Sequence, residues 1–231
     1  INRVQLSPTV AITAKAIALK SAGQDIITLS AGEPDFETPS HIGEAAIEAI
    51  QAGKTKYTAV DGTKSLKDAI IHKFKRDNNL IFNETEILVS SGGKQSLYNA
   101  CQALVEEKDE VIIPAPFWAS FPDMVKLAGG SPVIVQTGLE SSFRITPKKL
   151  VDSITSKTRA IIINSPCNPS GTAYTRCDWE GLAEVLVKHP NIYIIADDIY
   201  EHIYWGIEKY SNLLTACPDL RDRTILVNGV S

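Results

Sequence analysis

From residue 86 onward, short runs of apolar, largely β-branched residues alternate with segments of helical periodicity. The apolar runs are Ile87–Val89, Val111–Ile113, Pro132–Val135, Ala160–Ile163, Tyr193–Ile195 and Ile225–Val227. Helical patterns occupy about residues 94–107, 117–128 and 177–188. Strands that are apolar throughout and separated by helices are typical of a parallel sheet with both faces covered. We therefore predict an α/β fold in which a mostly parallel, mixed sheet is sandwiched by helices.

The first part of the chain is less regular. Helical patterns cover residues 8–22, 40–53 and 64–78, and a short apolar run at residues 26–29 predicts a strand. We expect residues 1–38 to contribute to a separate small domain. Residues 39–231 are then expected to form a large domain that is incomplete at its C-terminal end.

Composition and charge argue against two classes of function. The net charge of −4 over 231 residues disfavours a nucleic-acid partner, because phosphate binding favours a basic face. No apolar run approaches the roughly 20 residues that span a membrane. The four cysteines lack CxxC spacing and the four histidines are scattered. This pattern indicates reduced thiols, a cytoplasmic location and no metal site.

Polar segments follow three of the apolar runs. They are Asn164–Gly171, Ala196–Tyr200 and Asn228–Ser231. The carboxyl ends of parallel strands meet at one edge of the sheet, where α/β proteins build their sites. Two X-Pro steps stiffen the first segment and present the Asn168 amide as a neutral donor. Asp197 ends an apolar strand and is costly to bury unpaired, so it requires a cation or strong donor such as a protonated heterocyclic nitrogen.

Two further segments are compatible with a ligand but do not require one. Ser90–Gln95 follows an apolar run and opens a helical pattern. Its small residues and free amides suit a phosphate, although the spacing is not that of a Walker A loop. Trp118 follows two prolines at a strand end, where an indole can stack on a planar ring. A plain tight turn and a half-buried tryptophan explain these segments as well.

Taken together, these residues resemble the pyridoxal-phosphate-dependent aminotransferases of fold type I, class I, and within them the bacterial aspartate aminotransferase branch. The segments that carry the resemblance are Ala31–Phe36, Lys54–Tyr57, Gly92–Gln95, Trp118, Asn164–Gly171, Asp197–Tyr200 and Val227–Gly229. They occur in the expected order and cover nearly the whole chain. The resemblance implies pyridoxal 5'-phosphate as cofactor.

The resemblance implies roles at the cofactor ring. Asp197 would pair with the pyridine nitrogen and hold its proton, because a nearby carboxylate raises the affinity of that nitrogen for a proton. Tyr200 and Asn168 would donate to the phenolic oxygen of the ring, which favours the phenolate and lowers the pKa of the Schiff base. Trp118 would stack on the ring face and border the substrate.

The resemblance also implies how the phosphate and a second subunit are bound. The backbone at Gly93 and Lys94 would hold the cofactor phosphate. Tyr57 would reach the phosphate bound by the partner subunit, so a homodimer is expected.

The substrate is implied to be an acidic amino acid. Gly32 and Asn168 would hold its α-carboxylate, and Trp118 would lie beside it. Lys94, with Thr9, would meet the distal carboxylate, since an ammonium suits a second carboxylate. This set favours aspartate and glutamate, with prephenate as a further candidate. A solvated lysine at a helix start is the alternative explanation of Lys94.

The Schiff-base lysine of the family is expected immediately after Ser231. No residue within the chain is therefore assigned as catalytic, and we expect the chain as given to be inactive. Two other functions stay open. One is a pyridoxal-phosphate-dependent β-lyase or decarboxylase of the same fold, because fold alone does not settle the reaction. The other is a lysine-free, non-catalytic binding module.

Overall fold

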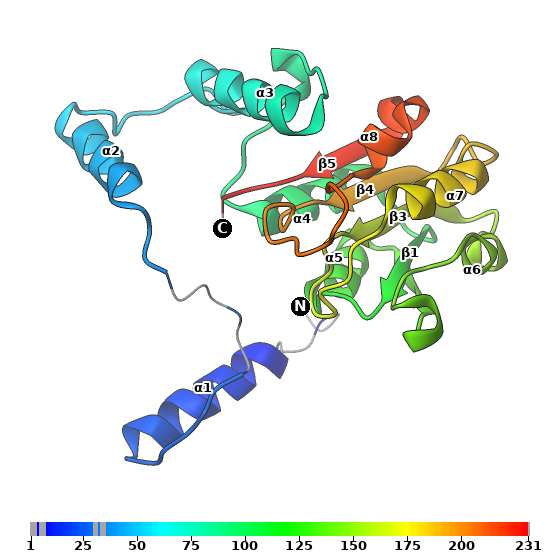
Figure 1. Cartoon of the computed structure of the whole chain (residues 1–231), viewed down its shortest axis with the longest axis horizontal. Helices are drawn as coiled ribbons and strands as arrows, with labels where there is room; N and C mark the ends of the chain where they lie inside the picture. Colours follow the sequence, from blue (N-terminus) through cyan, green and yellow to red (C-terminus); the bar gives the residue numbers. More distant parts are fainter. Residues whose placement is uncertain (1–3, 5–7, 30–31, 33–35, 231) are drawn as a thin grey trace. The chain divides into compact units, whose positions relative to one another are not determined.

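The computed structural model describes residues 4, 8–29, 32 and 36–230. The chain divides into two compact units, a smaller one within residues 5–60 and a larger one that includes residues 61–230 (Figure 1). No helix among the described residues is both long and apolar enough to cross a membrane.

The smaller unit contains the helices α1 (Pro8–Ser21) and α2 (Ser40–Gln51). Both agree with the sequence prediction to within two residues. The strand predicted at residues 26–29 was wrong, because those residues are coil. Ile27 and Leu29 are almost fully exposed. A strand is stable only when its backbone pairs with another strand and one face is buried, and the described part of this unit provides neither.

The larger unit is built on a five-stranded sheet with the order β2-β1-β3-β4-β5. Its strands are β1 (Glu110–Ala115), β2 (Ser131–Gln136), β3 (Thr158–Asn164), β4 (Tyr193–Asp197) and β5 (Thr224–Val227). Every neighbouring pair is parallel, so the predicted α/β class is confirmed, with no antiparallel strand in the described part. Residues 87–89, predicted as a further strand, lie outside the sheet. Val89 makes a single backbone bond to Asp61.

Helices precede the first strand of this unit and connect the later ones. They are α3 (Lys64–Asn78), α4 (Gly93–Leu104), α5 (Ser120–Ala128), α6 (Pro147–Ser153), α7 (Arg176–Leu186) and α8 (Leu213–Ala216), with short 3₁₀ turns η1 (Glu84–Glu86), η2 (Leu139–Ser141) and η3 (Pro218–Arg223). Capping residues in the local sequence determine where α3 and α7 begin. The Thr63 side chain caps α3, and Thr175 with Asp178 forms a capping box at α7, which satisfies amides that have no partner within the helix.

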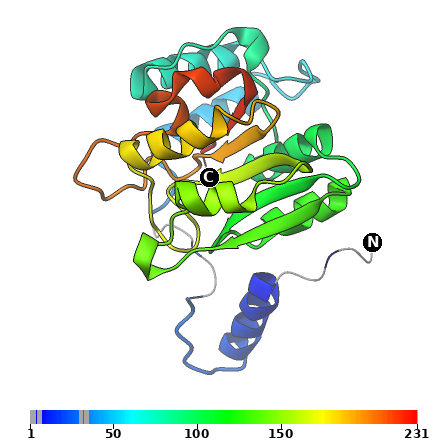
Figure 2. The same ribbon diagram turned by 90° about the vertical axis from the view of Figure 1, so that its right-hand side faces the viewer.

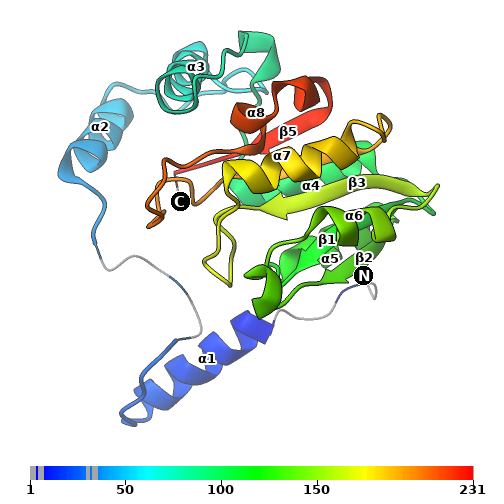
Figure 3. The same ribbon diagram turned by 45° about the vertical axis from the view of Figure 1, so that its right-hand side comes forward.

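The two faces of the sheet bury separate apolar clusters. Along β3, Ile161 and Ile163 belong to the cluster that contains residues of α6, α7 and α8. Ala160 and Ile162 belong to the cluster that contains residues of α4 and α5. Figures 2 and 3 show α6 and α7 on one face of the sheet and α4 and α5 on the other. Because helices cover both faces of the sheet, the strands are largely apolar along their length, as the sequence predicted.

Candidate functional site

Three polar motifs meet at the carboxyl edge of the sheet. Asn164, the last residue of β3, is paired in register with Asp197, the last residue of β4, and Asp197 is paired with Val227 at the end of β5. The loops that follow these strands therefore start side by side. This is the position at which parallel sheets place ligands.

Asp197 is a buried acid without a cationic partner among the described residues. The residue is 5% exposed, and one carboxylate oxygen, Oδ1, accepts a hydrogen bond of 3.2 Å from the Ile199 backbone N–H. Burial raises the pKa of Asp197 to about 6, and the bond from Ile199 only partly offsets this effect. The ionised carboxylate is thus under-stabilised, and a cation or a strong donor at this edge would stabilise it.

The loop after β3 brings an amide next to a phenol. Asn164 donates through Nδ2 to the Asp197 backbone carbonyl at 2.9 Å and accepts from the Asn168 N–H at 2.7 Å. These bonds hold the loop in place. The Asn168 Nδ2 then donates to the Tyr200 hydroxyl oxygen at 3.3 Å. Both side chains are partly exposed, so the amide and the phenol, each a hydrogen-bond donor, lie together at the edge near Asp197.

The start of α4 lies at the same edge. Gly92 has φ +84°, a conformation that favours glycine, and Gly93 begins the helix. A Cβ at Gly93 would lie 3.6 Å from Ile199 Cδ1 and 3.7 Å from Val227 Cγ1, so this turn lies against the loop after β4 and the last residue of β5. The amides of a first helical turn lack partners within the helix and bind anions.

Lys94 and Trp118 contact each other. The Lys94 Nζ lies 4.9 Å from the centre of the Trp118 ring, a cation–π distance. The indole also makes an edge-to-face contact with Phe121 at 5.6 Å between ring centres. Lys94 is exposed and Trp118 is half-buried. Lys94 and Trp118, which the sequence analysis considered separately, are therefore in contact in the fold.

The remaining predicted residues belong to the smaller unit. Tyr57 is fully exposed, and Gly32 is exposed. Thr9 lies in α1. Most of the segment Ala31–Phe36, and Ser231, lie outside the described residues. The roles implied for Thr9, Gly32 and Tyr57 stay predictions.

Sequence reasoning missed a buried polar layer behind Asp197. Asp198 is 1% exposed and Asn212 is fully buried. Neither Asp198 Oδ2 nor Asn212 Nδ2 has a hydrogen-bond partner in the described part of the chain. Burial, with the nearby charges of Glu201 and Asp197, raises the pKa of Asp198 far above its ordinary range. The signal in the sequence was a second acid directly after Asp197.

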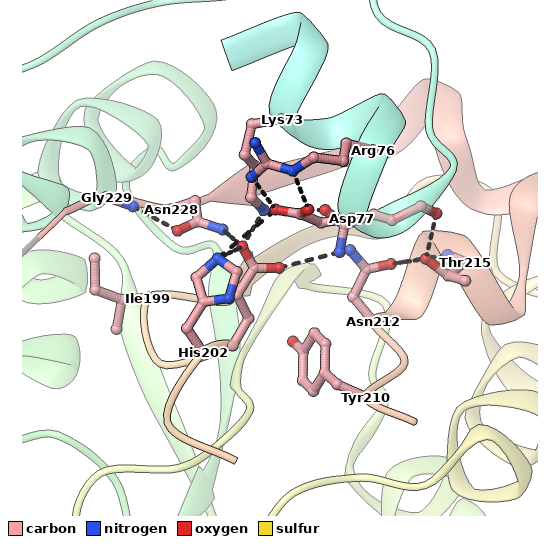
Figure 4. Close-up of polar contacts among 12 residues, drawn as sticks. Lys73, Arg76, Asp77, Ile199, His202, Tyr210, Asn212, Thr215, Asn228 and Gly229 are labelled. Atoms are coloured by element: carbon pink, nitrogen blue, oxygen red, sulfur yellow. Dashed lines mark hydrogen bonds and ion pairs between the residues drawn. The ribbon is translucent and has the colours of Figure 1, made fainter. Parts of the chain in front are cut away.

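Glu201 also belongs to this layer, and unlike Asp198 its carboxylate has charged and hydrogen-bonding partners. It forms an ion pair with Lys73 and accepts hydrogen bonds from Asn78 at 3.0 Å and Asn228 at 2.8 Å (Figure 4). The loops after β4 and β5 are linked by the bond to Asn228.

Glu201 also lies near two further groups that bind metals in other proteins. Ligand atoms of Asp77, Glu201 and His202 lie within 4.8 Å of one another. Lys73 and Arg76 already pair with the two carboxylates, so these charges are balanced without an ion. We assign no metal to this cluster.

The chain was compared with known proteins. Residues 24–231 match the family model for aminotransferase class I and II. The whole chain is 54% identical to an aspartate/prephenate aminotransferase of Nitrosomonas europaea and 46% identical to an aspartate aminotransferase of Rhizobium meliloti. It spans 58% and 56% of these relatives, respectively.

Solved structures agree with this family match. The crystal structure of the Rhizobium meliloti aspartate aminotransferase superposes with a TM-score of 0.96 over all of this chain and 58% of that chain. An aspartate aminotransferase from Thermus thermophilus, 40% identical, superposes with a TM-score of 0.94 over all of this chain and 60% of that one. The predicted large-domain fold is confirmed, and the chain belongs to the class I and II aminotransferases.

Proposed function

We propose that the protein to which this chain belongs transfers an amino group between an acidic amino acid and a 2-oxo acid, with pyridoxal 5'-phosphate as cofactor. The observation that carries the proposal is the buried carboxyl of Asp197. It lies at the carboxyl edge of the sheet without a cation among the described residues, where a protonated ring nitrogen would stabilise its charge.

The residues at this edge fit the cofactor. Pyridoxal phosphate supplies an electron sink for the charge that develops at the substrate Cα. Asp197 would keep the proton on the ring nitrogen. Asn168 and Tyr200, which already bond to each other, would donate to the phenolic oxygen, and the first turn of α4 at Gly93 would hold the phosphate. Trp118 would cover the ring.

Lys94 supports a dicarboxylic substrate. Its ammonium is exposed and held near Trp118, beside the proposed ring, where it would pair with a distal carboxylate. Thr9 would assist it, and Gly32 and Asn168 would hold the α-carboxylate. Names of the relatives point the same way, since several are aspartate/prephenate aminotransferases and the Thermus structure contains maleate, a dicarboxylate.

The wider organisation follows from the same proposal. A lysine is expected immediately after Ser231 to bind the cofactor and move the substrate proton. Residues 1–38 would contribute to a small domain, and residues 39–231 to the large domain. Tyr57 would contact the cofactor phosphate of a second subunit in a homodimer located in the cytoplasm.

The proposal is tested with protein expressed from its whole coding sequence. We expect it to bind pyridoxal phosphate with an absorbance change and to transfer the amino group of aspartate to 2-oxoglutarate. Release of ammonia or CO2 without transfer would instead indicate a β-lyase or decarboxylase. Neither cofactor binding nor turnover would indicate a non-catalytic binding module.

A variant connects this activity to the site. Asp197→Ala should lower kcat by a factor of at least about 100, which is the cost of removing one electrostatic contact at a reacting centre. It should not lower thermal stability. Near-normal kcat in this variant would contradict the assignment of Asp197.

A further inference from the structure

The loops after β4 and β5 are connected beyond the end of the sheet. The last backbone bond between them runs from the Asp198 N–H to the Val227 carbonyl at 2.8 Å. Beyond Val227 the two loops are joined by a side-chain hydrogen bond, in which Asn228 Nδ2 donates to Glu201 Oε1 at 2.8 Å. The contact between the two loops therefore continues past the last strand residues.

Glu201 is held by α3 through both carboxylate oxygens, since Lys73 pairs with Oε1, the oxygen that also accepts from Asn228, and Asn78 binds Oε2. Its carboxylate is almost completely buried and is paired with Lys73 of α3. Asn78, at the end of the same helix, donates to Oε2 at 3.0 Å. A buried carboxylate with partners on both oxygens has little freedom to move, because losing any one partner would leave a desolvated charge.

The loop after β5 has a second point of contact with the loop after β4. The Asn228 Oδ1 accepts the Gly229 N–H at 2.7 Å. A Cβ at Gly229 would lie only 2.7 Å from Ile199 Cδ1, so the two loops approach closely here, and a larger residue at 229 would require the Ile199 side chain to shift. Figure 4 shows Asn228 and Gly229 beside Ile199.

From these contacts we propose that Glu201 is a positioning residue, which acts through Asn228 to fix the loop after β5 against the loop that carries Asp197 and Tyr200. The inference rests on the proposed function, in which a lysine that follows residue 231 must meet the cofactor held by Asp197. Small displacements of a reacting group are costly to catalysis. A carboxylate anchored in α3 would prevent such a displacement.

The substitution Asn228→Asp tests this link with little change in shape. It keeps an oxygen to accept the Gly229 N–H, but it places a carboxylate opposite Glu201 where a donor stood. Adding Glu201→Gln to this variant replaces the acceptor carboxylate at position 201 with an amide. The amide N–H can donate to the carboxylate at position 228, so that the bond forms with reversed polarity. The matched control is Arg223→Met, which removes contacts at the opposite end of β5, where Arg223 donates to Leu186, His189 and Ile192 carbonyls.

The first readout is hydrogen exchange of the amides of residues 228–230 in cofactor-free protein from the whole coding sequence. Asn228→Asp should speed this exchange about tenfold to a hundredfold, the effect of losing one charge-assisted bond in a local opening. The double variant should recover at least part of the protection. Arg223→Met should change the exchange rates of residues 228–230 no more than it changes those of the amides elsewhere in the sheet.

The second readout is the pH titration of the absorbance of bound pyridoxal phosphate. Its midpoint should move in Asn228→Asp and not in Arg223→Met, because only the first variant changes where the loop meets the cofactor. Wild-type exchange at residues 228–230 together with an unmoved midpoint would overturn the inference. If the wild-type protein binds no cofactor, the proposed function fails, and the exchange data still decide whether Glu201 holds the loop.

Discussion

Asp197→Asn should stabilise the cofactor-free protein, and the gain should grow with pH. In the unfolded chain this carboxyl has an ordinary pKa of 3.8, and burial raises the pKa to about 6 in the fold. A raised folded pKa means that the contribution to stability is complete below pH 3.8 and is lost as pH rises through 6. The ionised side chain therefore costs stability under neutral and alkaline conditions.

The size of the effect follows from the two pKa values. The cost is about 3 kcal/mol at pH 8 and about half of that at pH 5. The asparagine can still accept the Ile199 N–H, although its own N–H groups lack partners, at a cost of about 1–2 kcal/mol that does not depend on pH. The pH-independent cost cancels when the two pH values are compared. The variant should therefore gain about 1–2 kcal/mol more at pH 8 than at pH 5.

Urea unfolding at pH 5 and pH 8 measures this difference. The exposed carboxylate of Asp152, paired with Lys148, provides a control, since Asp152→Asn should show no such growth with pH. If Asp197→Asn raised the free energy of unfolding equally at both pH values, the reasoning would be refuted. Such a result would mean that burial does not raise the pKa of the Asp197 carboxyl.

Three further predictions concern the site and its scaffold. Lys94→Gln should lower kcat/KM for aspartate by about 10- to 100-fold, the value of an ammonium–carboxylate contact, without affecting a neutral aromatic amino acid; equal losses for both would contradict a role in substrate choice. Tyr200→Phe should raise the midpoint of the cofactor absorbance titration by about one pH unit, because one donor to the phenolic oxygen is lost, and an unchanged midpoint would remove Tyr200 from the ring. Arg223→Met should lower the free energy of unfolding in urea by about 2–3 kcal/mol, since the carbonyls of Leu186 at the end of α7 and of His189 and Ile192 between α7 and β4 lose their donor. Cofactor affinity should stay unchanged, and a loss below about 0.5 kcal/mol would show that water replaces the guanidinium.

Much of the sheet could be predicted because local sequence and tertiary burial agree. The strands β1 to β5 are apolar on both faces, and each lies where an apolar run was found. The helix α3 was predicted at its observed bounds, since Thr63 caps its start and its apolar residues recur with helical spacing. The helix α6 was missed because its seven residues are too few for periodicity to be recognised.

Errors arose where an apolar run had no partner in the fold described. Residues 26–29 and 87–89 carry strand-like residues, but they are not in the sheet. Strand propensity measures how well side chains fit a pleated surface, so it fails where no such surface is present.

The meeting of Asp197 and Asn168 could be predicted because each lies at or just after the end of a strand. The parallel order of β3 and β4 brings Asp197 and Asn168 to one edge of the sheet. Gly93 follows residues 87–89, which are not a strand, and only the fold shows that it lies near Ile199 and Val227. The layer formed by Asp198, Glu201 and Asn228 depends on contacts between distant segments. The second acid directly after Asp197 was a local signal for a polar layer, but the partners of these residues could be identified only from the fold.

The central claim is that Asp197 holds a proton on the ring nitrogen of pyridoxal phosphate. The most direct measurement is nitrogen NMR of the protein from the whole coding sequence, loaded with cofactor labelled at that nitrogen. The account predicts a protonated nitrogen from pH 6 to pH 9 in the wild type and an unprotonated one in Asp197→Asn. An unprotonated nitrogen in the wild type, or the same signal in both proteins, would contradict it.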